Sequence, residues 1–314
     1  MSDGPANAGA ERRIDVHHHV LPPQYEATTP MPFKVSDTAT QLRTMDEFRI
    51  EAAITSLTPR VFEEHGHERR AVARACNEYM ASLVRDHPGR FGAFATLPLP
   101  DVDGALEEVT YALDTLGLDG IGLFSSSESK FLGDPLYDPL FEELNRRKAL
   151  VFMHPAHCKA PDELNLATPP SCIEYIFDST RAILNMLVRG TFRRSPDVRI
   201  IFCHGGSTIP YLAGRISGLE QSAKVPDVIG TLRALYYDVA SAMTPYALPS
   251  LQALADPAHI LWGSDLPFVS GAKLAHEIAE WEEYQGFDAA TRRAIERDNA
   301  LRLFPRLATV GHKA

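Results

Sequence analysis

Eight short apolar runs recur along the chain, and longer stretches with helical periodicity separate most of them. The runs lie at residues 13–20, 52–57, 91–97, 120–125, 150–155, 199–204, 235–240 and 260–265. Near-continuous apolar runs of this length are typical of parallel strands that are buried on both faces. Eight strands that alternate with helices predict an α/β fold of the (β/α)8 TIM-barrel type in a single domain.

Amphipathic stretches between the runs support this alternation. They lie at residues 68–87, 103–117, 138–149 and 171–190. The first ends at a Pro88-Gly89 stop signal, and the second ends on a glycine. A doubly wound open sheet is the alternative fold. It would usually carry a glycine-rich phosphate-binding loop after its first strand, where this chain reads "HHHVLPP".

Short ends flank the predicted barrel. We expect residues 1–12 to form a disordered tail, residues 13–305 the barrel, and residues 306–314 a C-terminal tail. The first ten residues lack the basic and apolar regions of a secretory signal peptide. No apolar run approaches the roughly 18 residues of a membrane helix. We therefore expect no membrane association.

The charge balance and the cysteines bear on partners and compartment. The chain has 31 Lys and Arg residues against 41 Asp and Glu residues, a formal net charge of −10. This balance argues against nucleic acid as a partner, because phosphate binding requires basic patches. The four cysteines are Cys76, Cys158, Cys172 and Cys203, and none forms a C-x-x-C pair. Reduced thiols in the cytoplasm are the simplest interpretation.

Polar side chains with metal-binding chemistry follow several of the predicted strands. They are His17 and His19 in the first run, His154 in the fifth, His204 in the sixth and Asp265 in the eighth. In a barrel the carboxyl ends of all strands meet at one face, which carries the active site. Two long irregular stretches, 21–37 and 156–170, follow strands at this same face, so we expect them to form pocket walls or lids.

The histidine triplet at residues 17–19 fits two inward ligands and one spacer. Strand side chains alternate between faces, so His17 and His19 point the same way and His18 points the opposite way. Imidazole is a favoured ligand for zinc, iron, manganese and cobalt, and a carboxylate completes such a site. Together with His154 and Asp265, the two inward histidines would bind one divalent ion and leave room for water or substrate.

Five motifs carry a family resemblance: "IDVHHHVLP", "FMHPA", "FCHGGSTIPYLAGRI", "WGSDLPF" and "DNALRLF". From about Arg13 to Phe304, the sequence resembles the amidohydrolase-2 branch of the amidohydrolase superfamily. It is similar to the group that contains aminocarboxymuconate-semialdehyde decarboxylase, γ-resorcylate decarboxylase and 6-methylsalicylate decarboxylase. The motifs are specific for the family and much less specific for the substrate.

The resemblance implies roles for individual residues. The implied metal ligands are His17, His19, His154 and Asp265. His204, in "CHGG", matches the family's active-site histidine, which positions or activates a metal-bound water. Other branches of the superfamily use a carboxylated lysine to bridge two metals, but no lysine ends a strand here. One ion is therefore implied, with zinc expected first and manganese or cobalt as alternatives.

Several residues are candidates for contact with the substrate. Arg215 matches an arginine of the aminocarboxymuconate decarboxylases that binds a substrate carboxylate across a dimer interface, so the resemblance also implies a homodimer. Arg181 lies in "YIFDSTRAILNML", which resembles a helix of members near 6-methylsalicylate decarboxylase. Arg60 follows the second run and could clamp a carboxylate in a bidentate way. Phe268 lies near the end of the eighth run and suits a flat apolar substrate, and Asp238 ends the seventh run and should border the site.

These features predict a metal-dependent, non-oxidative decarboxylase of a small carboxylic acid. The expected substrate is an ortho-hydroxybenzoate such as 6-methylsalicylate, or an unsaturated carboxymuconate-type acid. A divalent ion can chelate a carboxylate with an adjacent hydroxyl, and Asp265, His204 or the water between them would supply the proton. A hydrolase, lactonase or hydratase that uses metal-activated water is the alternative. A non-enzymatic binding protein is a third hypothesis, which the retention of all four implied ligands opposes.

Overall fold

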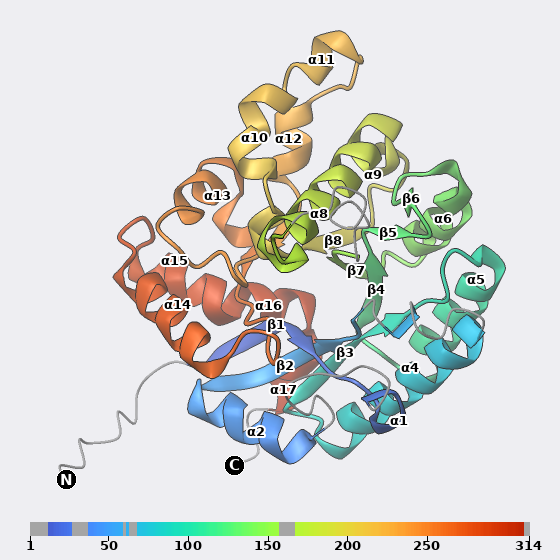
Figure 1. Cartoon of the computed structure of the whole chain (residues 1–314), viewed down its shortest axis with the longest axis vertical. Coiled ribbons are helices and arrows are strands. Elements are labelled where there is room, and N and C mark those ends of the chain that lie inside the picture. Colours follow the sequence, from blue (N-terminus) through green and yellow to red (C-terminus); the bar gives the residue numbers. More distant parts are fainter. Residues whose placement is uncertain (1–11, 27–36, 59–60, 63–67, 157–166, 311–314) are drawn as a thin grey trace.

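The computed structural model describes residues 12–26, 37–58, 61–62, 68–156 and 167–310. In this part of the chain, eight parallel strands form a nearly closed barrel with helices around it (Figure 1). In sheet order they are β1 (Arg13–His19), β2 (Ile50–Ser56), β3 (Phe91–Thr96), β4 (Gly120–Phe124), β7 (Leu150–His154), β8 (Arg199–Phe202), β9 (Tyr236–Asp238) and β10 (Ile260–Leu261). Each predicted run supplies one strand, so the predicted single-domain (β/α)8 fold is confirmed.

Helices follow the strands on the outside of the barrel. They are α1 (Pro23–Glu26), α2 (Thr38–Glu47), α4 (Arg69–Asp86), α5 (Val102–Thr110), α6 (Asp138–Arg146), α8 (Pro170–Arg189), α9 (Thr191–Arg194), α10 (Ile209–Ile216), α11 (Leu219–Ser222), α12 (Val228–Arg233), α13 (Leu248–Leu254), α14 (Gly271–Glu283), α15 (Ala289–Arg293), α16 (Asn299–Leu303) and α17 (Pro305–Val310). The four predicted helical stretches correspond to α4, α5, α6 and α8. A short antiparallel hairpin, β5 (Ser126–Ser127) and β6 (Lys130–Phe131), follows β4 and had no signal in the sequence.

Local sequence signals explain where several helices begin and end. Asp101 precedes α5, and its side chain accepts a hydrogen bond from the Gly104 amide at 3.0 Å. Ser270 caps α14 in the same way. Such side chains satisfy amides that have no partner within the helix. Gly190 ends α8 with a φ of 76°, a left-handed conformation that glycine adopts without steric cost.

The barrel closes between β1 and the segment around β10, without a regular ladder. The Val16 amide donates to the Trp262 carbonyl at 3.0 Å, and the His19 amide donates to the Leu266 carbonyl at 2.7 Å. His18 and Leu266 form an isolated parallel bridge. This seam brings the two ends of the barrel sequence together at the place where the predicted ligands lie.

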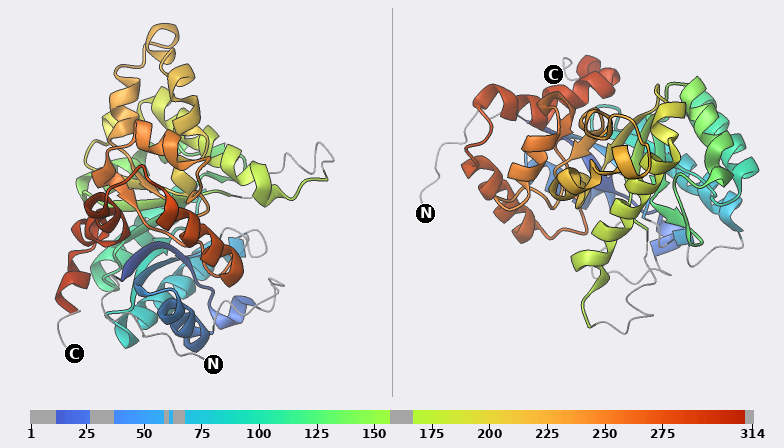
Figure 2. Two further views of the ribbon diagram at one scale, coloured as in Figure 1. Left: turned by 90° about the vertical axis from the view of Figure 1, so that its left-hand side faces the viewer. Right: turned by 90° about the horizontal axis from the view of Figure 1, so that it is seen from above.

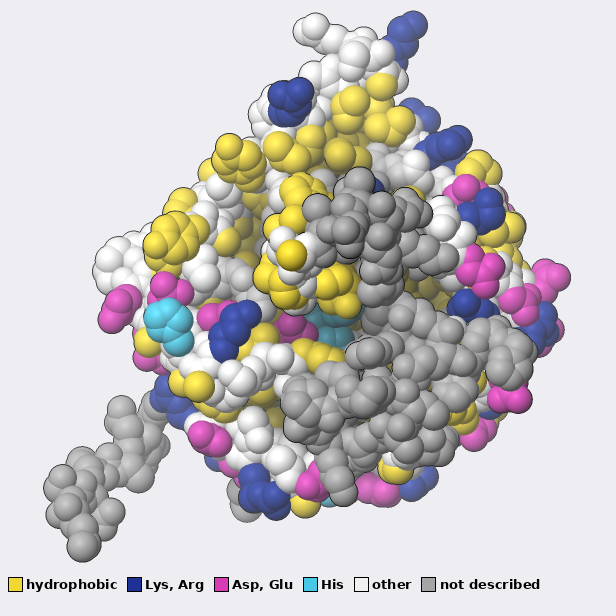
Figure 3. All heavy atoms as spheres, in the orientation of Figure 1, with side chains coloured by type: hydrophobic (Ala, Val, Ile, Leu, Met, Phe, Trp, Pro, Cys, Tyr) yellow, Lys and Arg dark blue, Asp and Glu magenta, His cyan; other side chains and the backbone are white. Residues whose placement is uncertain are grey.

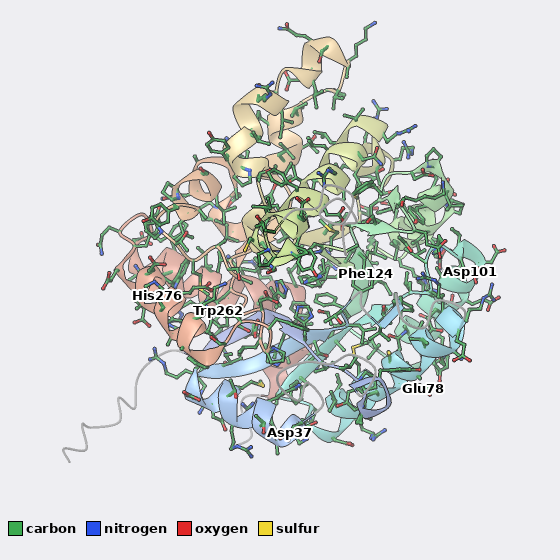
Figure 4. The ribbon with its side chains drawn as sticks, in the orientation of Figure 1. Asp37, Glu78, Asp101, Phe124, Trp262 and His276 are labelled. Atoms are coloured by element: carbon green, nitrogen blue, oxygen red, sulfur yellow. The ribbon has the colours of Figure 1, made fainter. Side chains whose placement is uncertain are left out.

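Aromatic rings fill the inside of the barrel beneath the strand ends. Phe94 and Phe152 stack at a centroid distance of 5.2 Å, and Phe304, after α16, packs edge-on against Phe94 at 5.8 Å. A separate and larger apolar cluster lies between the strands and the surrounding helices. Figure 4 shows Phe124 near the middle of the barrel, whereas Asp37, Glu78 and Asp101 lie towards the outer helices.

The C-terminal helix α17 starts where the predicted tail begins. Leu307 is buried, and Arg306 contacts both carboxylate oxygens of Asp119 at 2.6 and 2.7 Å. The predicted domain boundaries stay predictions, since residues 1–11 and 311–314 lie outside the described residues. The same holds for most of the predicted pocket walls, at 27–36 and 157–166.

Two groups of helices extend beyond the barrel. Helix α8 reaches outward on one side, and α10, α11 and α12 extend away from the strands (Figure 2). None of the helices in the described residues is long and apolar enough to cross a membrane.

Candidate metal centre

Four side chains converge at the carboxyl ends of the strands. His17 and His19 come from β1, His154 ends β7, and Asp265 follows β10. One ligand atom of each lies within 4.8 Å of the others. Figure 3 shows histidine and acidic side chains deep in the centre of this face, beneath apolar side chains. The structure thus brings together the four residues that the sequence predicts as ligands.

The distances between these atoms fit a small cation. His17 Nε2 and His19 Nε2 are 3.1 Å apart, and Asp265 Oδ1 lies 3.1 Å from His19 Nε2 and 3.4 Å from His17 Nε2. Ligands at about 2.1 Å from one ion in tetrahedral geometry are about 3.4 Å apart. The donor set of three imidazoles and one carboxylate suits zinc, manganese, cobalt or iron.

Each of the three cluster imidazoles has a partner close to its Nδ1 atom. His17 Nδ1 lies 2.9 Å from Asp238 Oδ2, and His19 Nδ1 lies 3.2 Å from Ser56 Oγ. His154 Nδ1 lies 2.9 Å from the Pro155 carbonyl oxygen, which can only accept a hydrogen bond. A histidine that donates from Nδ1 leaves the Nε2 lone pair free for a metal ion.

Asp15 shapes the backbone that carries these ligands. Its carboxylate accepts hydrogen bonds from the His17 amide at 3.0 Å and from the Ser264 amide at 2.9 Å. It also contacts Ser264 Oγ at 2.5 Å and His18 Nδ1 at 3.0 Å. The pairing of β1 with β2 is irregular between Asp15 and His18. As predicted, His18 faces away from the cluster, and Asp15 ties β1 to the residue before Asp265.

His204 borders the cluster from the end of β8. Its Nε2 lies 3.6 Å from Asp265 Oδ2, and its ring centroid lies 5.0 Å from that of His17. The His204 amide donates to Asp238 Oδ1 at 3.0 Å. Its Nδ1 is buried and has no hydrogen-bond partner among the described residues. His204 is therefore available for proton transfer next to the cluster.

The electrostatics of the cluster favour positive charge. Burial lowers the pKa of His17, but the charges of Asp238 and Asp265 outweigh burial and raise this pKa to about 10. Burial lowers the pKa values of His19 and His154, so these rings are neutral. Burial alone would raise the pKa of Asp265, yet His17 and its other hydrogen-bond donors hold it well below its usual range. A cation at this point would take the place of the proton on His17.

The predicted substrate-binding residues are spread more widely. Phe268 is partly exposed, and its ring lies 5.1 Å from that of His19, at the mouth of the site. Arg181 is exposed on α8 and Arg215 is exposed on α10. Arg60 lies outside the described residues. Phe268 contacts a cluster histidine, and the substrate-binding roles of all four residues stay predictions.

Asp238 has a larger part in the site than the sequence indicated. The end of the seventh run marked it as a border residue, and the structure places it, fully buried, against the ring of His17 and the backbone amide of His204. The Ser56 contact to His19 had no sequence signal beyond its place at the end of β2.

Comparisons with known proteins agree with this geometry. A family model described as amidohydrolase matches residues 14–306. The decarboxylase yanB of Aspergillus niger is 36% identical over 94% of this chain and 88% of its own length. The 6-methylsalicylic acid decarboxylase of Penicillium expansum is 30% identical over 96% of this chain and 99% of its own length.

Solved structures share the fold. The crystal structure of an amidohydrolase II is 29% identical with a TM-score of 0.88, over 93% of this chain and 99% of that one. A dihydroxybenzoic acid decarboxylase from Polaromonas sp. JS666, with bound manganese and the inhibitor 2-nitroresorcinol, is 22% identical with a TM-score of 0.80, over 94% and 97% of the two chains.

Proposed function

We propose that this chain, which belongs to the amidohydrolase family, is a metal-dependent, non-oxidative decarboxylase of small aromatic carboxylic acids. The observation that carries the proposal is the convergence of three imidazoles and one carboxylate beside a further histidine at the active-site face of the barrel. Relatives that cover nearly the whole chain are decarboxylases. The metal site and the named relatives thus support the same class of reaction.

An ortho-hydroxybenzoate is the substrate class that we favour. A relative with matching length acts on 6-methylsalicylic acid, and the structurally similar Polaromonas enzyme acts on a dihydroxybenzoic acid. Such acids place a carboxylate next to a hydroxyl on a flat ring. Phe268 lies at the mouth of the site, against His19. The Phe152 ring packs against His17, with 5.0 Å between the two ring centroids. Both rings offer apolar surfaces to such a substrate.

His17, His19, His154 and Asp265 would hold one divalent ion. When bound, this ion would supply positive charge that orients the carboxylate and its neighbouring hydroxyl and stabilises developing negative charge. We propose zinc as the ion, with manganese or cobalt as alternatives, since all of them accept this donor set.

Asp265 and His204 are the groups that we assign to proton transfer. During the reaction the bond between the ring carbon and the carboxylate carbon breaks, CO2 leaves, and the electron pair stays on the ring carbon. That carbon then takes a proton. His204 Nε2 and Asp265 Oδ2 lie 3.6 Å apart, so the two groups border the same point of the site and either could donate that proton.

A homodimer would give Arg215 a role that one chain alone does not. Arg215 is exposed on α10, which extends away from the barrel, so it would reach a substrate carboxylate only in a partner subunit. Tyr211 and Tyr246, on and near the same projection, are 81% and 89% exposed. Light scattering of the purified protein tests this part of the proposal, and a monomer mass would contradict it.

A cytoplasmic location is proposed from the thiol chemistry. Cys76, Cys172 and Cys203 are all free thiols in the described part of the chain. Free thiols are usual in reducing compartments.

Mass spectrometry of metal-loaded protein with a mixed panel of acids tests the function. The panel contains ortho-hydroxybenzoates, carboxymuconate-type acids and simple lactones. We expect loss of CO2 from an ortho-hydroxybenzoate, no reaction with His154→Ala, and full activity with His276→Ala, which changes an exposed histidine on α14. Gain of water by a lactone or an unsaturated acid, without CO2 loss, would replace the decarboxylase with the hydrolase or hydratase alternative.

A further inference from the structure

A hollow inside the barrel adjoins the proposed metal centre at His154. Its walls come from the neighbouring strands β2, β3, β4 and β7 and include Phe94, Thr96, Gly122, Phe124 and Phe152. Its volume is about 10 Å³, measured for the centre of a water molecule. That is about the room that one bound water requires.

The hollow exists because one layer of the barrel interior lacks a side chain. Thr96 pairs with Gly122 in the sheet register, and Gly122 pairs with Phe152. These three residues form one layer that faces inward, and Phe124 and His154 pair in the layer above. Barrel interiors are normally filled by such layers of side chains. Gly122 leaves a gap between the threonine and the phenylalanine.

The backbone does not require glycine at position 122. A Cβ added there would meet its nearest neighbours, the Ala95 carbonyl oxygen and Phe94 Cβ, at 3.5 Å, which is ordinary van der Waals contact. At Gly120, in the same strand, an added Cβ would lie 2.4 Å from the Leu150 carbonyl oxygen and would clash. Gly120 is therefore needed for packing, whereas Gly122 keeps space open.

Thr96 lines this space and carries a hydroxyl without a hydrogen-bond partner among the described residues. The residue is 2% exposed. Its backbone is fixed, because Asn77 Oδ1 accepts from the Thr96 amide at 2.8 Å and Asn77 Nδ2 donates to the Thr96 carbonyl at 2.9 Å. A buried hydroxyl without a partner is unfavourable, so a ligand group that bonds to it gains affinity.

We infer that this hollow is a substituent pocket, which receives one small group, hydroxyl or methyl, on the inward edge of an ortho-hydroxybenzoate ring. Gly122 sets the size of the group, and Thr96 makes a hydroxyl bind better than a methyl. The inference rests on the proposed function, because His154 borders both the metal centre and the hollow. It assigns the discrimination between ring-substituted and unsubstituted acids to two residues outside the metal centre.

Binding of unreactive nitro analogues to the manganese-loaded protein tests the inference. The probes are 2-nitrophenol, 3-methyl-2-nitrophenol and 2-nitroresorcinol, the last being the inhibitor bound to the Polaromonas enzyme. Calorimetry with the wild type should show 3-methyl-2-nitrophenol binding about 10-fold, and 2-nitroresorcinol about 100-fold, more tightly than 2-nitrophenol. Gly122→Ala should abolish this advantage and leave the affinity for 2-nitrophenol within about twofold.

Two further variants separate size from hydrogen bonding. Thr96→Val keeps the shape and removes the hydroxyl, so it should weaken 2-nitroresorcinol about 10-fold and leave 3-methyl-2-nitrophenol within about twofold. Gly214→Ala also adds one methyl group, at a position in α10 with no atom within 4 Å of the new Cβ. It should retain the wild-type preference.

The outcomes distinguish the inference from the proposed function. If Gly122→Ala weakens all three probes equally, or leaves the preference intact, the substituent pocket is wrong and the decarboxylase proposal stands. If none of the probes binds to wild-type protein that does hold manganese, the proposed function is wrong, and the substituent pocket fails with it.

Discussion

Asp238 joins the candidate ligand His17 to the candidate acid His204 through one buried carboxylate. One oxygen faces His17 Nδ1, and the other accepts from the amides of His204 and Ala240. Partners of this kind set the tautomer and the orientation of a metal-binding histidine. Asp238 should therefore govern metal affinity without touching the ion.

We predict that Asp238→Ala weakens metal binding by about 10- to 100-fold. Asp238→Asn should lie between this variant and the wild type, because an amide oxygen can still accept from His17 Nδ1. Competition with a coloured chelator measures the affinities. Asp256→Asn, which changes an exposed helix cap, is the matched control. Equal affinities for Asp238→Ala and the wild type would show that His17 is oriented by other contacts.

His17 should make metal binding depend on pH. Burial lowers its pKa, but Asp238 and Asp265 outweigh burial and raise the pKa to about 10. A histidine must lose its proton to bind a metal ion. Below this pKa the ion therefore displaces a proton, and the affinity should rise by about tenfold per pH unit between about pH 6 and 8.

Calorimetry in buffers with different ionisation enthalpies counts the protons released on metal binding. We expect about one proton per ion at neutral pH, because the lowered pKa values of His19 and His154 keep those rings neutral. An affinity that stays constant across this pH range would contradict the charge state assigned to His17.

Among the elements, α17 closes the end of the barrel opposite to the metal centre. Arg306 contacts both oxygens of Asp119 and donates to the Phe91 carbonyl at 2.9 Å, and Leu307 packs with the inner core. The Asp119 side chain is 8% exposed and also accepts from the Ala93 amide. The loss of Arg306 would leave a nearly buried carboxylate with one neutral donor.

We predict that Arg306→Ala lowers the free energy of unfolding by about 2 kcal/mol. Denaturation in urea measures the change. Arg189→Ala, at an exposed position on α8, should change stability by no more than about 0.5 kcal/mol. A small effect of Arg306→Ala would mean that α17 is a detachable tail, as the sequence alone suggested for residues 306–314.

The strands were predictable as elements, whereas several connections were not. The eight strands read as apolar runs because they are buried on both faces. The short helices α9, α11 and α12 span four to six residues, too few to show a helical period. Their existence depends on contacts with the rest of the fold.

At the scale of the whole molecule, the candidate metal ligands were predictable from the sequence, whereas the residues that line the neighbouring hollow were not. His17, His19, His154 and Asp265 were predictable because strand alternation and barrel topology alone bring strand ends to one face. The hydroxyl of Thr96 and the gap at Gly122 depend on the register between β3, β4 and β7. A sequence read by itself does not give that register.

The metal centre should also stabilise the barrel as a whole. Its ligands come from β1, β7 and the segment after β10, so an ion would tie together a seam that no regular ladder closes.

An ion that binds only the folded state stabilises that state by about 2.7 kcal/mol at a free concentration of 100 times its Kd. For a chain of this size we predict that removal of the ion by a chelator lowers Tm by about 5 °C. Thermal unfolding followed by circular dichroism, with and without chelator, measures the shift. The Tm of His154→Ala should not change with chelator, because this variant lacks a ligand. If the wild type has the same Tm with and without chelator, at metal concentrations that saturate the site, the ion does not bind preferentially to the folded barrel, and the centre lies elsewhere.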